Sequence, residues 1–330
     1  MNGSEPLGER RIIRIIQEQL EVMAGLPLGF GDDVSAISID DGRLAVLKAD
    51  MLVGKTDIPP GMSVRQAARK AVVMNVSDFA AKGVEPLVIL ASLGLPRELG
   101  EDDVREIGRG LNEAAREYGA YVIGGDTNES SDLIISCSLL GFSEEGRLIS
   151  RCGAKPGDIV AVTGEFGRTA AGLKILMEGL SAPEEIEEPL REAVLMPKAR
   201  LREGVALSGT GVVTSSIDSS DGLAWSLHEL SDASRVGFTI DSLPIAEEAL
   251  EFAGIHGLDP WELALYGGEE YELVVTVRPD GWGEAEAAVR EAGGSLLRIG
   301  VVTEEVRVEL RVDGETRPIE RRGWEHFKMG

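Results

Sequence analysis

Residues 63–83, SVRQAARKAVVMNVSDFAAKG, are the stretch that decides the fold of this 330-residue chain. Ser63 is a residue type that caps helix N-termini, and Gly83 is the residue type that most often ends a helix. The residues between them follow helical spacing, so we predict one long helix bounded by these two positions.

One face of this predicted helix carries the first functional signal. Ala68, Ala71, Asn75 and Asp78 are three or four positions apart and therefore share a single stripe. A stripe of alanines usually packs closely, so the amide and the carboxylate are expected to be partly buried. A buried carboxylate is either hydrogen-bonded to nearby backbone or bound to a cation, and we favour the cation for Asp78.

The segments around this helix indicate an α/β fold class. We predict an amphipathic helix over 8–25 that ends near Gly25, a buried strand over 44–53, a short strand over 121–128 that runs into a glycine turn, and a strand over 133–142. The second half repeats a theme of strand, glycine-bearing turn and helix over 151–180, 212–231 and 267–291. We therefore predict two α/β domains, 1–150 and 151–330.

Composition excludes several classes of protein. A formal charge of −24 argues against a nucleic-acid partner, because such proteins need basic stripes. No apolar run is long enough to span a membrane. The chain shows no basic, apolar leader and has only two cysteines, Cys137 and Cys152, so we expect a cytosolic protein.

A second set of acidic residues differs from the solvated glutamate runs. These aspartates stand beside glycine, serine or apolar residues and lie far apart in the sequence: Asp33, Asp50, Asp78, Asp126, Asp218 and Asp221. A fold that gathers them creates an anionic pocket, which is stable only when cations fill it. Oxygen ligands with no histidine or cysteine nearby favour Mg²⁺, which usually accompanies phosphates. We predict a site for a magnesium-bound polyphosphate.

Two of these motifs also suit phosphate binding directly. In GGDTN (124–128) the Gly125 backbone can approach a phosphate closely. In DSSDGL (218–223) Ser220 and Asp221 precede a helical pattern, where free N–H groups favour anions, although an ordinary helix cap explains one of them equally well. Arg151 is either a bidentate phosphate ligand or a surface arginine. No histidine lies near the acidic motifs, so we predict no catalytic general base.

Together these motifs resemble the thiamine-monophosphate kinase family, within the ATP-binding superfamily that also holds aminoimidazole ribonucleotide synthetase and selenophosphate synthetase. The resemblance covers nearly the whole chain, in order: GDDVSAI (31–37), ADMLV (49–53), KAVVMNVSDFAAKG (70–83), GGDTN (124–128), SRCGAKPGD (150–158), VTGEFGRTAAGL (162–173), the segment 197–200, IDSSDGL (217–223), GGEEYEL (267–273) and GWEHF (323–327). It implies direct transfer of the γ-phosphoryl group of ATP to thiamine monophosphate, and a homodimer whose N-terminal sheets pair.

The resemblance also implies roles for individual residues. The six aspartates would hold several Mg²⁺ ions. Gly108, Gly125, Asp126, Arg151 and Ser220 would contact ATP, and Asp57, Glu269 and Trp324 would contact the thiamine substrate. Two positions depart from the family pattern. Lys48 and Ala49 stand where relatives often have a metal-contacting Ser or Thr pair, and Asp57 stands where many have a histidine.

Three other functions stay open from the sequence. One is the ATP-dependent cyclisation of the purine pathway, carried out by a relative in the superfamily. Selenophosphate synthesis is disfavoured because no cysteine lies near the N-terminus. The third is a non-catalytic sensor of thiamine phosphates or nucleotides, which the intact aspartates of every motif argue against.

Overall fold

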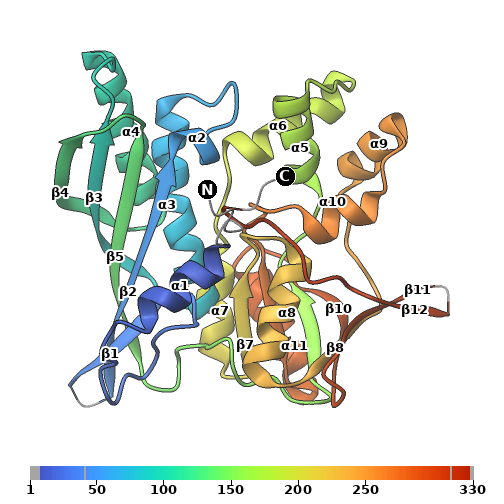
Figure 1. Cartoon of the computed structure of the whole chain (residues 1–330). Helices are drawn as coiled ribbons and strands as arrows, with labels where there is room; N and C mark the ends of the chain where they lie inside the picture. The colour runs from blue at the N-terminus through green and yellow to red at the C-terminus, as the bar shows by residue number, and fades with distance from the viewer. Residues whose placement is uncertain (1–7, 41, 313, 328–330) are drawn as a thin grey trace, which may run out of the picture.

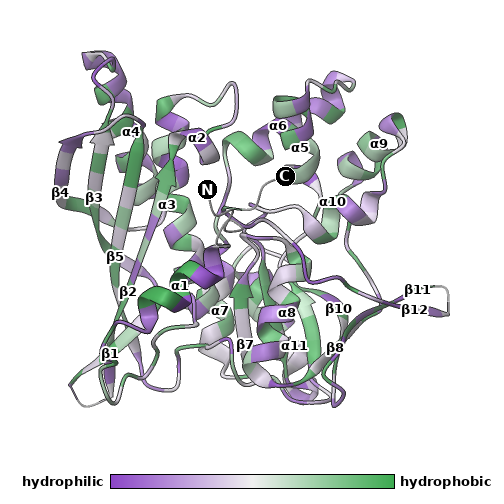
Figure 2. Ribbon diagram, in the orientation of Figure 1, coloured by the Kyte–Doolittle hydropathy of each residue, from purple (hydrophilic) through white to green (hydrophobic). Residues whose placement is uncertain are grey.

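The computed structural model describes residues 8–40, 42–312 and 314–327. In that part of the chain two mixed sheets stand side by side, each with helices packed on it (Figure 1). Figure 2 shows hydrophobic residues concentrated on the strands of both sheets. The α/β fold class predicted from the sequence is confirmed. Among the described residues, no helix is both long enough and apolar enough to cross a membrane.

The first sheet has the strand order β1-β2-β5-β3-β4. Its strands are β1 (Ser35–Asp40), β2 (Arg43–Val53), β3 (Pro86–Leu95), β4 (Tyr121–Glu129) and β5 (Ile134–Glu144). Neighbouring strands run antiparallel except β3 and β4, which are parallel. The short helix α2 (Gly54–Asp57) follows β2, and α3 (Val64–Lys82) packs between this sheet and α4 (Glu101–Glu117).

Helix α3 begins and ends where the sequence predicts. Ser63 and Gln66 form a capping box, in which the Ser63 N–H donates to the Gln66 side chain at 2.9 Å. Gly83 ends the helix with φ of 68°, a left-handed conformation that suits glycine. The helix is buried on almost every side, because it also packs against α7 and β7 of the second half. It therefore brings charged side chains into the interior.

The second sheet has the order β12-β11-β8-β10-β6-β9-β7. Its strands are β6 (Ile159–Val162), β7 (Val213–Asp218), β8 (Gly237–Ile240), β9 (Leu273–Val277), β10 (Leu297–Thr303), β11 (Val308–Val312) and β12 (Glu315–Pro318). The helices are α5 (Arg168–Glu178), α6 (Glu184–Leu195), α7 (Leu201–Thr210), α8 (Leu223–Ser234), α9 (Glu247–His256), α10 (Pro260–Tyr266) and α11 (Trp282–Glu291), with a 3₁₀ turn at Pro279–Gly281.

Strand β9 shows why the strands of this sheet have nearly continuous apolar sequences. Val274 packs into one core cluster, whereas its neighbours Leu273 and Val275 pack into the other. Both faces of the strand are therefore covered, and alternation with polar residues is lost. The larger core cluster contains residues of both halves of the chain. The domain division between residues 150 and 151 stays a prediction.

Two local predictions are wrong. The first helix, α1 (Glu9–Gln17), ends eight residues before Gly25, because none of its residues is buried and no packing supports further turns. The glycines of GGDTN do not form a turn. Strand β4 continues through Gly124, Gly125 and Asp126, since pairing with β3 overrides the local preference for a turn.

Candidate active site

Three buried carboxylates converge where the two halves meet. Asp33 precedes β1, Asp78 lies on α3 and Asp218 ends β7, and each offers an oxygen within 4.8 Å of the other two. All three residues are at most 6% exposed. Three carboxylates at this spacing repel one another strongly unless cations or protons intervene. Their oxygen chemistry and spacing fit a divalent cation such as Mg²⁺.

Two basic side chains hold Asp33 in place. Lys82, fully buried on α3, places its Nζ 2.8 Å from Asp33 Oδ2 and 2.7 Å from Asp32 Oδ1. The Arg151 guanidinium donates to Asp33 Oδ1 through Nε at 2.9 Å and also through Nη2. Burial would raise the pKa of the Asp33 carboxyl, but these two cations outweigh burial and lower that pKa. These two partners therefore favour the ionised form of Asp33.

The other two members of the cluster carry raised pKa values. Burial, reinforced by Asp33, raises the pKa of Asp218 to about 6 despite the hydrogen bond that Ser77 donates at 2.6 Å. Burial is also the largest effect at Asp78 and raises its pKa well above the ordinary value, against the opposing effect of Lys48. A bound cation relieves this penalty, so the cluster favours cation binding.

A cavity of about 470 Å³ opens beside the cluster. The cavity is lined by Arg151, Asp218, Ser220, Asp221 and Trp324, and on its other side by residues of α1. Burial, with help from Asp218, raises the pKa of Asp221 to about 7. The structure thus gathers four residues that were predicted to bind metal or ATP, Arg151, Asp218, Ser220 and Asp221, around one cavity that Trp324 also lines.

Helix α1 covers this cavity through polar contacts. Arg10 forms an ion pair with Glu229 at 2.5 Å and stacks on Trp225, with 3.9 Å between the guanidinium carbon and the ring centroid. Glu9 accepts a hydrogen bond from the His326 backbone at 3.2 Å. The helix is therefore attached to the site without entering the core.

The predicted substrate contacts Asp57 and Glu269 are connected by Lys70. This fully buried lysine of α3 donates to the Asp57 carbonyl at 2.9 Å and to Glu269 Oε1 at 2.5 Å. The Asp57 side chain turns back to accept from the Val53 N–H at 2.6 Å. Glu269 has φ of 65°, which is uncommon outside glycine and marks a position fixed by its surroundings.

Sequence reasoning missed Lys70 and Lys82, both of which join α3 to the second half. Lys82 also donates to the Ser216 carbonyl at 2.7 Å. The sequence did offer one sign of these contacts, because each lysine stands among alanines and valines on the helix and is therefore buried. Without the fold, however, nothing identified the carboxylate that each lysine meets.

Three predicted ATP or metal positions lie elsewhere. Asp126 is exposed on β4 at the edge of the first sheet. Register pairs Asp50 with Cys137, Cys137 with Ala91, and Ala91 with Gly125. Asp126 is thus three strands from Asp50, or about 14 Å. The two carboxylates of one chain cannot share an ion.

Gly125 lies in a tightly packed part of the first sheet, whereas Gly108 lies on an open helix surface. A Cβ on Gly125 would lie 1.7 Å from the Ala91 carbonyl oxygen, so the close approach of β3 and β4 already requires glycine. Gly108 lies on the exposed side of α4, with open space around its Cα. The ATP contacts of both residues stay predictions.

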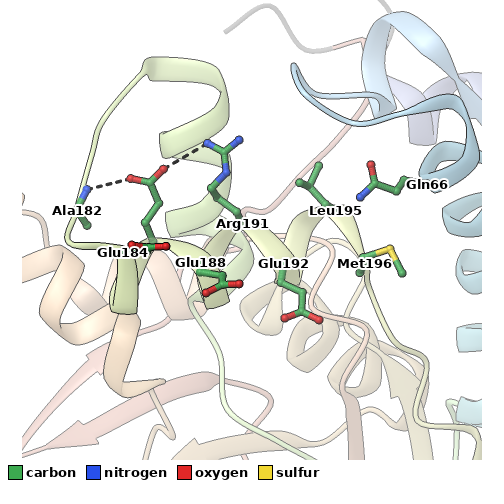
Figure 3. Close-up of a pocket in the computed structure, with 9 residues that line it drawn as sticks. Gln66, Ala182, Glu184, Glu188, Arg191, Glu192, Leu195 and Met196 are labelled. Carbon is green, nitrogen blue, oxygen red and sulfur yellow. Dashed lines mark hydrogen bonds and ion pairs between the residues drawn. The ribbon is translucent and has the colours of Figure 1, made fainter.

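A larger pocket, about 680 Å³, is separate from the acidic cluster and the cavity beside it. It lies between α6 and the start of α3 and is lined by Glu184, Glu188, Glu192 and Arg191 (Figure 3). Arg191 is held by Glu187, which also accepts from the Ala182 N–H. None of the predicted site residues lines this pocket, so the smaller cavity is the candidate active site.

Comparisons with known proteins cover nearly the whole chain. Residues 31–143 match the N-terminal domain of AIR synthase related proteins, and residues 155–313 match the C-terminal domain. The chain is 38% identical to a thiamine-monophosphate kinase of Pyrococcus horikoshii over 324 residues, covering 98% of this chain and 97% of the relative. This chain belongs to the thiamine-monophosphate kinase family. The family resemblance seen in the motifs is confirmed.

Solved structures of the family share the whole fold. A structure described as AaThiL complexed with AMPPCP and TMP matches with a TM-score of 0.85 at 31% identity, covering 97% of both chains. A thiamine-monophosphate kinase from Aquifex aeolicus matches with a TM-score of 0.78 at 30% identity, covering 93% of this chain and 97% of that one. The kinase fold therefore extends over both halves of this chain.

Proposed function

We propose that this enzyme transfers the γ-phosphoryl group of ATP directly to the phosphate of thiamine monophosphate, giving thiamine diphosphate and ADP. The observation that carries the proposal is the convergence of Asp33, Asp78 and Asp218 next to the 470 Å³ cavity that also contains Arg151 and Ser220. Support also comes from the family relatives and from the related structure described with an ATP analogue and TMP.

The main barrier to this reaction is electrostatic. The acceptor is already an ionised phosphate oxygen, so no side chain needs to remove a proton. Two polyanions must instead approach in a site with little water, where they repel strongly. Mg²⁺ bound at the carboxylates would neutralise this charge and align the two groups for in-line transfer.

The protein's own residues prepare the site for these ions. Lys82 and Arg151 orient the Asp33 carboxylate, and Ser77 orients the Asp218 carboxylate, so both carboxylates are positioned before any ligand binds. Preorganised charges of this kind need no rearrangement during the reaction. We assign the primary cation position to the cluster of Asp33, Asp78 and Asp218, with Asp126 and Asp221 as further ligands. The family resemblance also implies Asp50, whose carboxylate is paired with Lys48 in this chain.

The thiamine end of the substrate is assigned to the part of the cavity that Trp324 lines. Trp324 is 54% exposed, and its backbone N–H donates to the Asp221 carbonyl at 3.0 Å, which places an open aromatic face beside the acidic residues. The Glu269 backbone N–H donates to the Ser220 carbonyl at 2.7 Å, and the Glu269 side chain is oriented by Lys70. A cationic thiazolium ring suits both an aromatic face and a carboxylate.

A homodimer would complete the site. The face of the first sheet that points away from α3 exposes Leu47, Met51, Leu90 and Phe142 by 43–54% each. Such a patch is typical of a protein interface. Because Asp126 is three strands from Asp50 within one chain, a second copy would have to bring Asp126 to the acidic cluster. Light scattering of the purified chain tests this, and a monomeric mass at micromolar concentration would refute it.

Product analysis tests the function itself. The purified full chain is incubated with ATP, Mg²⁺ and thiamine monophosphate, and thiamine diphosphate and ADP are separated chromatographically. We expect both products in equal amounts, and none when EDTA is present. Tight substrate binding without turnover would support a sensor instead. Conversion of formylglycinamidine ribonucleotide in a parallel reaction would support the purine-pathway cyclisation.

A further inference from the structure

Lys48 lies inside the acidic cluster. On β2 its side chain points to the same face as Leu44, Val46 and Leu52, all of them buried under α3. The Lys48 Nζ is 2.9 Å from Asp78 Oδ2 and 3.4 Å from Asp50 Oδ1, and the lysine side chain is only 18% exposed. Within the described ranges, no other basic side chain forms an ion pair with Asp50 or Asp78.

The surrounding contacts hold this arrangement from both sides. The Asp50 N–H donates to Asn75 Oδ1 at 2.9 Å, and Asn75 in turn donates to the Ala71 carbonyl on α3 at 2.9 Å. Strand β2 is thereby fixed against α3 at the level of the cluster. The Lys48 ammonium is therefore held between the two carboxylates, 2.9 Å from Asp78 Oδ2 and 3.4 Å from Asp50 Oδ1.

An ammonium at this point competes with a divalent ion. Mg²⁺ binds carboxylate oxygens at 2.0–2.1 Å. An ion that bridged Asp50 and Asp78 would have to occupy the space that Lys48 Nζ fills between the same two carboxylates. A monovalent and a divalent cation within a few ångströms of each other also repel strongly in a poorly hydrated site. The two occupants exclude each other.

We propose that the Lys48 ammonium replaces a divalent cation between Asp50 and Asp78, so that divalent ions bind only on the Asp33–Asp218 side of the cluster. The tethered cation then presents the remaining hydrogen-bond donors of its ammonium to a phosphate, as lysine does in other phosphate sites. This inference deepens the proposed function, and it rests on that function only for the identity of the phosphate.

Counting bound Mn²⁺ ions tests the inference without substrate or turnover. Free Mn²⁺ is measured by electron paramagnetic resonance while the full chain is titrated. We expect Lys48→Ser to bind one Mn²⁺ more per chain than the wild-type protein, with an affinity for that ion about tenfold above surface carboxylates. Lys155→Ser removes a lysine from an exposed turn and should leave the number unchanged.

A second variant decides the question even if Lys48→Ser does not fold. In the wild-type background, Asp50→Asn should bind as many Mn²⁺ ions as the wild-type protein, because Asp50 already pairs with the lysine. Loss of one ion in Asp50→Asn, or an unchanged count in folded Lys48→Ser, would overturn the inference. In the double variant Lys48→Ser/Asp50→Asn the additional ion should disappear again.

The outcome is independent of the kinase assay. A protein that shows the expected Mn²⁺ numbers but forms no thiamine diphosphate would refute the proposed function and leave the role of Lys48 intact. A protein that forms thiamine diphosphate but binds an ion at Asp50 would refute the role of Lys48 alone.

Discussion

Replacing Lys70 with methionine should weaken both the fold and substrate binding. Methionine has nearly the same length and volume, so the change removes the ammonium and leaves no cavity. Breaking a fully buried ion pair costs about 3–5 kcal/mol. Because the Glu269 side chain is 27% exposed, solvent recovers part of that cost. With the lost hydrogen bond to the Asp57 carbonyl included, we expect the free energy of unfolding to fall by about 3 kcal/mol.

The same variant separates positioning from simple stability. Urea unfolding followed by circular dichroism gives the free energy of unfolding, and steady-state kinetics at saturating ATP gives KM for thiamine monophosphate. We expect KM to rise about tenfold with little change in kcat, because Glu269 loses the partner that orients it. Lys55→Met, on the exposed turn of α2, is the matched control. Wild-type stability together with wild-type KM would show that Lys70 does not orient Glu269 for substrate binding.

Three further predictions concern the metal cluster, the first sheet and pH. Asp78→Asn should lower kcat at least about a thousandfold while the circular dichroism spectrum is unchanged, since several kcal/mol of charge stabilisation is lost; near-normal turnover would rule out metal binding by this residue. Gly125→Ala should lower the free energy of unfolding by about 3 kcal/mol, because its Cβ would lie 1.7 Å from the Ala91 carbonyl oxygen. The control Gly124→Ala meets only ordinary contacts, so its free energy of unfolding in urea should stay within about 1 kcal/mol of wild type. Burial raises the pKa of Glu270 to about 7, so its neutral form stabilises the fold below pH 4.5 and that contribution is lost as pH rises to about 7. Glu270→Gln should therefore gain about 2 kcal/mol relative to wild type between pH 5 and pH 8, and parallel stability curves for the two proteins would contradict the assignment.

The sequence predicted the parts of the fold that local chemistry determines. The ends of α3 follow from Ser63 and Gly83, which act on the helix turns next to them. The strand that carries Asp50 follows from a run of apolar residues long enough to be covered by another element. Both predictions needed information from only a few neighbouring residues.

Long-range pairing could not be predicted in the same way. Lys70 meets a carboxylate 199 positions away, and Lys82 meets a carbonyl 134 positions away. The glycines before Asp126 read locally as a turn, but pairing with β3 keeps them extended. The family resemblance placed Asp126 in the metal set, whereas strand order shows that one chain cannot bring it to Asp50.

The core that crosses from one half of the chain to the other has a consequence for how the protein responds to cleavage. Residues 145–147 form an exposed turn after β5, open to a protease. Helix α3, however, buries apolar residues against the second half and inserts Lys70 and Lys82 among its polar groups. A chain cut at this turn should therefore migrate as one particle in native gel filtration and as two pieces only after denaturation. Either piece made alone would expose the face of α3, or the face that receives it, and should aggregate.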